Sequence, residues 1–517
     1  RLSSSLAGAE RSEAAAVARV LGWVADDAST AALVGLLGDA DAEVAAAAAA
    51  ALAGIGGRAA REVLGALRDS DSARRQLLLA AVPLRPDVAA EVLPCLDDPD
   101  PDVRVLACEL LARAGATDAV PALFARLDDP DGRVTQAAVG AIQALGTSRT
   151  EALTLQTAAS PSVRVRLAAT RILGNFGWPS ALEPLLNNLH DDDARVRLAA
   201  VASLAHVEAP AAVEALLRVA ASSEDPKARA AAARALGCTG GGATVVGGLE
   251  ACLADPEPWV RYYACQALGR LQSTASLPQL VARLQDEAGQ VRIAVVDALA
   301  RLAVPEAIDV LVQAAGASDP DLRRAALIGL GQAHPEQGLG LLLDAVRSAE
   351  PATRVVALSA LVGFDDLAVE RTLASAAGDA EPTVRATAFG ALAARPGLAA
   401  TASLIAMLDD ADRHDEAAEA LGRHVDGRIP GILAEAERAT PERAALLVSA
   451  LARMDRPDAV AALGVALSVD RVAARRAAAT ALVAVGSDVA RALLAAAARH
   501  DPDSEVRRLA ALRLGDR

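Results

Sequence analysis

The sequence predicts an all-α fold, a right-handed α-solenoid of about sixteen stacked helical hairpins. Three observations point to it. An arginine recurs every 31 or 32 residues, with an alanine three residues later and a leucine seven residues later. A capping or turn residue stands six positions before each of these arginines. The 517 residues are 53% hydrophobic but only 2% aromatic, so the core must be built from small aliphatic side chains, among which alanine and leucine favour helices.

The recurring arginines, here called the repeat arginines, define the period. The full pattern with alanine and leucine is clearest at Arg166, Arg197, Arg261, Arg323 and Arg385. The same position holds Arg104, Arg229, Arg292, Arg354, Arg475 and Arg507, with Thr135 once in place of arginine. Three repeats are degenerate, at Ala45, around Arg74 and Arg75, and over residues 410–445. The even spacing leaves no room for an inserted domain.

Turn residues divide each unit into two helices. The residues six before a repeat arginine include Asp98, Asp129, Ser160, Asp191, Ser223, Asp255, Asp286, Asp379 and Asp501. Proline-rich pieces at 98–102 and 255–258 end one helix and start the next. The apolar runs upstream, such as 119–127 and 277–284, predict helix A, and the residues after the turn predict helix B. Gly146, Gly174 and Gly237 predict a second turn after helix B.

A single hairpin cannot bury its apolar face, so the hairpins must stack on one another. We expect the alanine three after the repeat arginine to let adjacent B helices approach closely. The leucine is expected to fill the layer between helices A and B. The aspartates and repeat arginines are expected to form a charge-assisted ladder from one repeat to the next. The alternative is that these charges only keep the surface soluble.

The pattern D-x-x-x-x-V-R-x-x-A-x-x-A-L-G resembles bacterial HEAT-like repeats, especially the type first described in phycobilisome lyases. The resemblance covers residues from about 28 to 515. It implies a superhelix that holds partners on its inner helices, since most such proteins are scaffolds and adaptors and a few are enzymes.

The domain prediction follows from the same pattern. We expect residues 28–517 to form the HEAT-like solenoid and residues 1–27 to form a partial N-terminal repeat with helix B only. Residues 10–22 have the pattern of a helix B without its helix A, and residue 1 is arginine. We therefore expect the chain to be a fragment of a longer protein or complex.

Charge and cysteine content narrow the function classes. The 51 basic and 66 acidic residues give a net charge of -15, which repels nucleic acid and anionic membranes. Nucleic-acid binding is therefore disfavoured. Five cysteines without a CxxC pair favour a reducing compartment, and we expect a cytoplasmic protein. No apolar run is long enough to predict a transmembrane segment.

Motifs for chemistry are not found. None of the six histidines forms an HExxH motif. The nearest set of potential metal ligands is Asp410, Asp412, His414, Asp415, His424 and Asp426, which we interpret as a polar irregular repeat. Gly240–Gly242 is interpreted as a loop between helices, because no Lys-Ser or Lys-Thr follows it. We predict no catalytic, cofactor-binding or metal-binding residues.

The aromatic residues are unevenly distributed. Of nine in the chain, five are Phe176, Trp178, Trp259, Tyr262 and Tyr263. Tryptophan and tyrosine often dominate the energy of protein interfaces. We predict that Trp178, Trp259, Tyr262 and Tyr263 mark a partner site, with Arg229 and Arg261 as charged neighbours. The alternative is that these rings fill a locally wider core.

The predicted function is a non-enzymatic scaffold or adaptor that binds a protein partner along the concave B-helix face of the superhelix. The identity of that partner does not follow from the residues. The alternative, which the lyase resemblance implies, is a tetrapyrrole (bilin) lyase-like or chaperone-like protein. Such a protein should have a deep pocket with convergent polar groups, and the candidate walls are Trp178 and the segment Trp259–Tyr263.

Overall fold

The computed structural model describes residues 11–37, 41–55, 89–333, 336–410, 412–454 and 456–512. The protein is 78% helical, and the described residues contain no strand. The predicted all-α solenoid is therefore confirmed. The chain divides into two units, residues 1–267 and 268–517, and each is described by itself.

The first unit alternates B and A helices. Its B helices are α2 (Arg11–Val24), α4 (Ala42–Ile55), α8 (Pro101–Arg113), α10 (Gly132–Leu145), α12 (Val163–Phe176), α14 (Ala194–Leu204), α16 (Pro226–Leu236) and α18 (Pro258–Arg270), whose last residues begin the second unit. Its A helices are α3 (Asp27–Leu36), α7 (Ala89–Val92), α9 (Val120–Ala125), α11 (Ser148–Thr157), α13 (Leu182–Asn188), α15 (Pro210–Ser222) and α17 (Ala243–Cys252).

The second unit continues the alternation. Its A helices are α19 (Leu277–Ala282), α21 (Pro305–Ala315), α23 (Glu336–Ala345), α25 (Leu367–Ala376), α27 (Leu398–Ala406), α29 (Arg428–Ala436), α31 (Pro457–Ala466) and α33 (Asp488–His500). Its B helices are α20 (Gly289–Leu302), α22 (Pro320–Ala333), α24 (Pro351–Leu361), α26 (Pro382–Ala394), α28 (His414–Leu421), α30 (Pro441–Arg453), α32 (Val472–Val485) and α34 (Ser504–Ala511).

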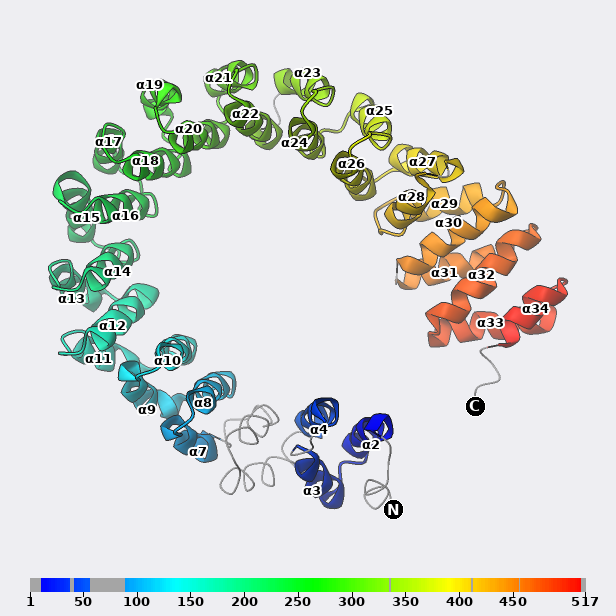
Figure 1. The fold of residues 1–517 in the computed structure, drawn as a ribbon, viewed down its shortest axis with the longest axis horizontal. Helices are drawn as coiled ribbons and strands as arrows, with labels where there is room; N and C mark the ends of the chain where they lie inside the picture. The colour runs from blue at the N-terminus through cyan, green and yellow to red at the C-terminus, as the bar shows by residue number, and fades with distance from the viewer. Residues whose placement is uncertain are drawn as a thin grey trace. The chain divides into compact units, whose positions relative to one another are not determined.

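The B helices pack against their own A helices and against neighbouring B helices, as α10 does with α9, α8 and α12. In the first unit, and from α19 to α28 in the second, the B helices form the inner row of the bend and the A helices the outer row (Figure 1). The described residues hold fifteen A–B pairs, α3/α4 and then α7/α8 through α33/α34. The predicted degenerate repeat around Arg74 and Arg75 lies outside the described residues. The right-handed sense of the superhelix stays a prediction.

The N-terminal end follows the same packing. Helix α2 contacts both α3 and α4, as a B helix does with its neighbours. The interpretation of residues 1–27 as a partial repeat stays a prediction.

The alanine and leucine of the repeat pattern form the core, as predicted. In α10 and α12 the alanines Ala138 and Ala169 and the apolar residues Ile142 and Leu173 are fully buried. The pattern thus places a small and a large buried side chain in these repeats. Small-to-large alternation of this kind fills a helical layer without voids.

The closest approach between B helices, however, is made by glycine. Gly174, Gly237, Gly269 and Gly331 stand eight residues after a repeat arginine, and a Cβ built on any of them would lie within 2.9 Å of the Cα of the next B helix. Gly174 was predicted to be a turn residue, but it lies inside α12 against Ser203 of α14. The prediction was wrong because helical glycine is tolerated where another backbone must come close. Gly146 does end its helix, with φ 39°.

The predicted ladder of charges is confirmed, with a geometry that differs from the expected one. The six-residue offset is a bond within one turn, in which the guanidinium donates to a backbone carbonyl. Arg104 donates from Nη1 to the oxygen of Asp98 at 2.8 Å, and Arg292 to the oxygen of Asp286 at 2.8 Å. The carboxylate partner is instead the aspartate of the following repeat.

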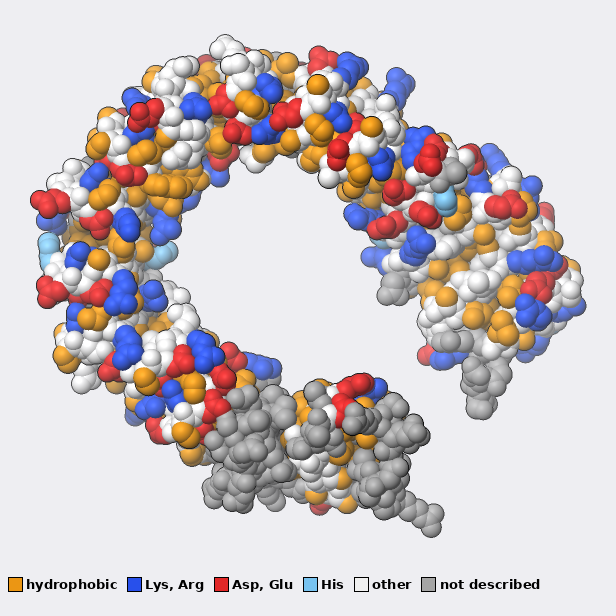
Figure 2. Space-filling view, in the orientation of Figure 1, with side chains coloured by type: hydrophobic (Ala, Val, Ile, Leu, Met, Phe, Trp, Pro, Cys, Tyr) orange, Lys and Arg blue, Asp and Glu red, His pale blue; other side chains and the backbone are white. Residues whose placement is uncertain are grey.

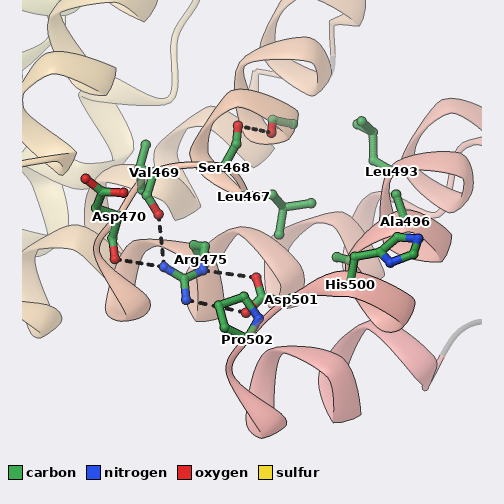
Figure 3. Close-up of a pocket in the computed structure, with 12 residues that line it drawn as sticks. Leu467, Ser468, Val469, Asp470, Arg475, Leu493, Ala496, His500, Asp501 and Pro502 are labelled. Carbon is green, nitrogen blue, oxygen red and sulfur yellow. Dashed lines mark hydrogen bonds and ion pairs between the residues drawn. The ribbon is translucent and has the colours of Figure 1, made fainter.

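In several repeats an ion pair joins the arginine to an aspartate of the next turn. Arg104 pairs with Asp129 at 2.7 Å, where both side chains are less than a tenth exposed. The equivalent pairs are Arg166–Asp191, Arg229–Asp255, Arg354–Asp379 and Arg475–Asp501. Arg292 pairs with Asp319, two residues further along the turn, because Ala317 stands at the aspartate position. Figure 3 shows Arg475 between the carbonyls of Val469 and Asp470 on one side and the Asp501 carboxylate on the other. One side chain therefore holds two successive turns together, and we call this chain of bonds the Arg–Asp ladder.

The ladder is interrupted in some repeats. Where Thr135 replaces the arginine, the next turn has Ser160 in place of aspartate. Arg323 faces Ser348 and pairs with Glu350 instead, at 3.6 Å. At Thr135 and Ser160 both members of the pair are absent, which avoids a buried charge without a partner. Arg197 is retained although the next turn has Ser223, and it donates to the carbonyls of Asp191 and Asp192.

The irregular repeats over 410–445 use a different arginine. Arg428 is fully buried at the start of α29. Its guanidinium donates to the carbonyls of Leu392, Ala393, Arg395, Ala420 and Arg423. These carbonyls belong to the ends of α26 and α28, where backbone oxygens lack partners within the helix. Burial lowers the pKa of Arg428 to about 10, so the side chain stays charged at neutral pH.

Glycine packing gives the first prediction. Gly331→Ala should lower the free energy of unfolding by about 1–3 kcal/mol, because the new methyl group overpacks against α24, where Ala360 Cβ lies 2.6 Å from the built Cβ. Gly390→Ala is the matched control, since nothing lies within 4 Å of its built Cβ; it should stabilise α26 by about 0.5–1 kcal/mol. Urea titrations followed by circular dichroism measure both. Equal effects of the two substitutions would rule out close packing at Gly331.

The ladder gives a prediction about acid. Hydrogen bonds from the arginine of the preceding repeat lower the pKa of Asp191, Asp319 and Asp379. Because the folded pKa lies below the unfolded one, their stabilising contribution is complete above the ordinary carboxyl pKa, about 4, and is lost as the pH falls through the folded pKa. The urea midpoint should therefore be level from about pH 7 to pH 5 and fall below about pH 4.

A variant separates the ladder from general acid effects. Asp379→Asn should lower the midpoint at neutral pH and reduce the acid-dependent fall, because its own titration is removed. Asp309→Asn, at an exposed position on α21, should leave the pH profile as in the parent protein. A full acid-dependent fall in Asp379→Asn would contradict the assignment.

Candidate functional site

An apolar groove lies on the inner B-helix row of the first unit. It has a volume of about 500 Å³, which is within the usual range for binding pockets. Figure 2 shows hydrophobic side chains gathered over α16 and α18 on this inner side. The groove is lined by Leu198 of α14, by Pro226, Lys227, Ala230, Ala231 and Arg234 of α16, and by Glu257, Trp259 and Tyr263 at and after the start of α18.

Aromatic residues form one wall of the groove. Helix α18 begins at Pro258, so Trp259 lies in its first turn, and the spacing of three and four residues places Tyr262 and Tyr263 beside it. The ring centroid of Trp259 lies 5.3 Å from that of Tyr262 and 6.2 Å from that of Tyr263. Trp259 is 50% exposed. The two tyrosines are half-buried, and Tyr262 Oη accepts a hydrogen bond from Gln266.

Alanines form the floor and cations the rim. Ala230 and Ala231 of α16 leave the space that larger side chains would fill. The Arg234 guanidinium lies over the Tyr263 ring, with Cζ 5.9 Å from the centroid, a distance that gives a cation–π attraction. Lys227, the only lysine in the sequence, stands at the N-terminal end of the same helix. The groove thus combines apolar surface with positive charge.

The structure brings together only part of the predicted partner site. Trp259 and Tyr263 line the groove, and Tyr262 packs against both. Trp178 lies elsewhere, after the C-terminal end of α12, where its ring stacks on Phe176 with centroids 4.4 Å apart. It follows the end of a B helix, whereas Trp259 lies at the beginning of one.

The two predicted arginines have structural bonds. Arg229 pairs with Asp255 in the ladder, and Arg261 is only 4% exposed and donates to the carbonyls of Asp255 and Pro256. The cations that line the groove are Lys227 and Arg234, which the sequence analysis did not select. The available signal was their position: neither is a repeat arginine, and Arg234 follows a run of alanines in α16.

A second hollow adjoins the groove. It has a volume of about 570 Å³ and is lined by residues of α10, α12 and α14 and by His206 in the turn after α14. Arg171, Asn175 and Arg195 are its polar residues nearest to solvent. Leu198 lines both hollows, so the groove continues along the B-helix row from α18 toward α10.

The other candidate for a binding site lies near the C-terminus. A hollow of about 530 Å³ is lined by residues of α31 and α33 and by the turns beside them. Its charged pair is Arg475 and Asp501, which are both committed to the ladder, and the ring of His500 lies away from that pair (Figure 3). The charged pair of this hollow therefore stabilises the stacking of repeats and is not available to bind a ligand.

The potential metal ligands of the sequence are dispersed. Asp410 pairs with Arg413, and His424 lies 3.1 Å from Asp458. Among the residues that the structure describes, no group of three or more histidine, cysteine, aspartate or glutamate side chains could hold a metal ion. In the described part of the chain no helix is long and apolar enough to cross a bilayer.

The cysteines are mostly buried. Cys95, Cys108, Cys252 and Cys265 lie in the core, and Cys238 is exposed. Burial raises the pKa of the Cys108 thiol to about 12 and that of Cys252 to about 11. A thiol with so high a pKa is a poor nucleophile at neutral pH, so these two cysteines act as small apolar core residues.

Comparison with known proteins identifies the repeat. A family model for HEAT repeats matches residues 89–155, 150–237, 247–333, 339–422 and 429–515. A search of curated protein sequences finds no match.

Solved structures with similar folds include karyopherins. A structure of Kap95p with RanGDP has a TM-score of 0.50 and 13% identity, over 99% of this chain and 83% of that one. The karyopherin Kap121p bound to the extreme C-terminus of the protein phosphatase Cdc14p has a TM-score of 0.50 and 11% identity, over 99% and 78%. The Kap95:Nup1 complex has a TM-score of 0.50 and 14% identity, over 94% and 76%. At these identities the likeness concerns the fold. Since the matched segments make up most of the sequence, the chain belongs to the HEAT-repeat family.

Proposed function

We propose that this protein is a non-enzymatic scaffold or adaptor that binds a protein partner along its inner B-helix row, with the groove at α14, α16 and α18 as the anchoring site. The observation that carries the proposal is Trp259, a large aromatic side chain that is 50% exposed beside an apolar groove. Exposing such a ring to water is unfavourable, and interfaces commonly use tryptophan as the anchor that a partner covers.

The lining of the groove supports binding rather than catalysis. It contains no histidine, cysteine, serine or threonine, so the usual pairing of a nucleophile with a general base is missing from it. Karyopherins of similar fold have been solved in complex with protein segments, including the C-terminus of Cdc14p, which supports the choice of a protein as the partner. Residence in the cytoplasm and a relationship to bacterial repeats of the phycobilisome-lyase type belong to the proposal and rest on the sequence alone.

The test is capture of a partner by the immobilised full chain. The double variant Trp259→Ala/Tyr263→Ala should weaken capture by about 2 kcal/mol, or roughly thirty-fold in affinity, because two anchor rings are lost. Circular dichroism should show unchanged helix content, since both side chains lie at the surface of α18. Trp23→Ala on α2 is the control, because Trp23 is 85% exposed and outside the groove. Capture that is equal in the parent and the double variant would refute the groove as the anchoring site.

A further inference from the structure

Charge is separated between the two rows of helices around the groove. The four consecutive B helices α10, α12, α14 and α16 contain nine arginine or lysine residues and no aspartate or glutamate. The A helices α11, α13, α15 and α17 contain four glutamates, Glu151, Glu183, Glu214 and Glu250, and two arginines, Arg149 and Arg218. The inner row is therefore basic in a chain whose net charge is -15.

Most of these nine cations already have partners. Arg166 and Arg229 belong to the ladder, and Arg197 donates to the carbonyls of Asp191 and Asp192. Arg133, Arg164 and Arg195 lie near aspartates of the turns. The remaining three, Arg171, Lys227 and Arg234, have no ion pair among the described residues. All three line the two joined hollows.

The spacing of these cations suits an extended chain. Neighbouring packed helices lie about 8–10 Å apart, and an extended peptide advances about 3.3 Å per residue. A peptide laid across the B-helix row would therefore meet a new helix about every third residue. Arg171 lies on α12, and Lys227 and Arg234 lie on α16, so the cations without an ion pair occur on two B helices, with α14 between them. The aromatic wall of α18 follows at one end.

We propose that the groove takes an extended, acidic protein segment with an apolar or aromatic residue at one end. The acidic side chains would face Arg171, Lys227 and Arg234, and the apolar residue would pack between Trp259, Tyr263 and the alanine floor of α16. Glu257 is the one acidic residue of the lining, and it lies at the aromatic end, where the ligand is apolar. This inference rests on the protein-binding function proposed above and specifies the chemistry of the partner.

The observations favour a protein segment over a nucleic acid. Proteins that bind nucleic acid through its backbone commonly neutralise about six to ten phosphates, whereas the joined hollows offer three cations without an ion pair. The floor of Leu198, Ala230 and Ala231 presents methyl groups, which suit aliphatic side chains better than stacked bases. An acidic peptide with an apolar end satisfies both the charge and the floor.

The experiment selects binders to the intact chain from a phage-displayed library of random peptides of about twelve residues. Recovered peptides should be enriched in aspartate and glutamate and should contain an aromatic or large aliphatic residue near one end. A synthetic copy of the most enriched peptide should bind at least about ten-fold more weakly to Lys227→Glu/Arg234→Glu than to the parent, because attraction becomes repulsion. Its affinity for the parent should also fall as salt is raised.

Two controls accompany the selection. Arg218→Glu reverses an exposed arginine on the outer helix α15 and should change affinity by less than about two-fold, because exposed charges outside the contact contribute little. Acylation of Lys227 by an N-hydroxysuccinimide ester should be slowed by the bound peptide. The modified lysine is identified by mass spectrometry without ambiguity, because the sequence contains no other lysine.

Each alternative result overturns the inference in a distinct way. Selected peptides without acidic enrichment, still dependent on Trp259 and Tyr263, would refute the acidic ligand and leave the proposed function standing. Tighter binding of a single-stranded polyuridine RNA of similar length than of any peptide would assign the groove to nucleic acid. Failure to select any peptide would refute a linear segment as ligand. Peptides that bind the Trp259→Ala/Tyr263→Ala variant unchanged would refute the anchoring groove and with it the proposed function.

Discussion

The Arg–Asp ladder is the interaction on which the stacking of repeats depends. A ladder arginine bonds to a carbonyl of its own turn and to the carboxylate of the next turn, as Arg354 does with Ser348 and Asp379. The aspartate in turn accepts the N–H of Glu381 at 2.9 Å, which shapes the turn that starts the next B helix. A planar guanidinium with five donors can make all these bonds at once. Apolar burial supplies the driving force, while the ladder sets the position of one hairpin against the next.

The same constraint determines which side chains remain for function. The guanidinium groups of Arg229 and Arg261 already make structural bonds. They are therefore poorly placed to bind a partner, although they lie close to the aromatic cluster in sequence. The cations that can do so stand at other positions of the B helices, as Lys227 and Arg234 do. Close packing has a similar effect: alanines and glycines bring B helices together, and on α16 the small side chains of Ala230 and Ala231 leave the floor of the groove open. Fold and site therefore arise from one repeat pattern.

Much of the fold was predictable from the period, because a fixed spacing of arginine, alanine and leucine specifies a helical face in every repeat. The atom that accepts the bond at the six-residue offset was not predictable. The sequence cannot show whether Asp98 accepts from Arg104 through its backbone carbonyl or through its carboxylate. Gly174 was misassigned because a buried helical glycine and a turn glycine look alike in sequence. At the site, aromatic spacing identified Trp259 and Tyr263, but Trp178 was grouped with them although it follows the end of its helix. The role of Arg234 could not be predicted, because its place at the groove depends on its contact with Tyr263 of α18.

A double-mutant cycle tests the central claim most directly. Arg475–Asp501 and Arg476–Asp503 both join α32 to the turn before α34, but the first pair is 8% and 5% exposed and the second 49% and 17%. The free energy of unfolding would be measured for each pair as parent, two single alanine variants and double variant. If the ladder holds repeats together, the coupling energy of Arg475 with Asp501 should reach about 2–3 kcal/mol, against about 0–1 kcal/mol for the exposed pair. Equal, small coupling in both cycles would contradict the account.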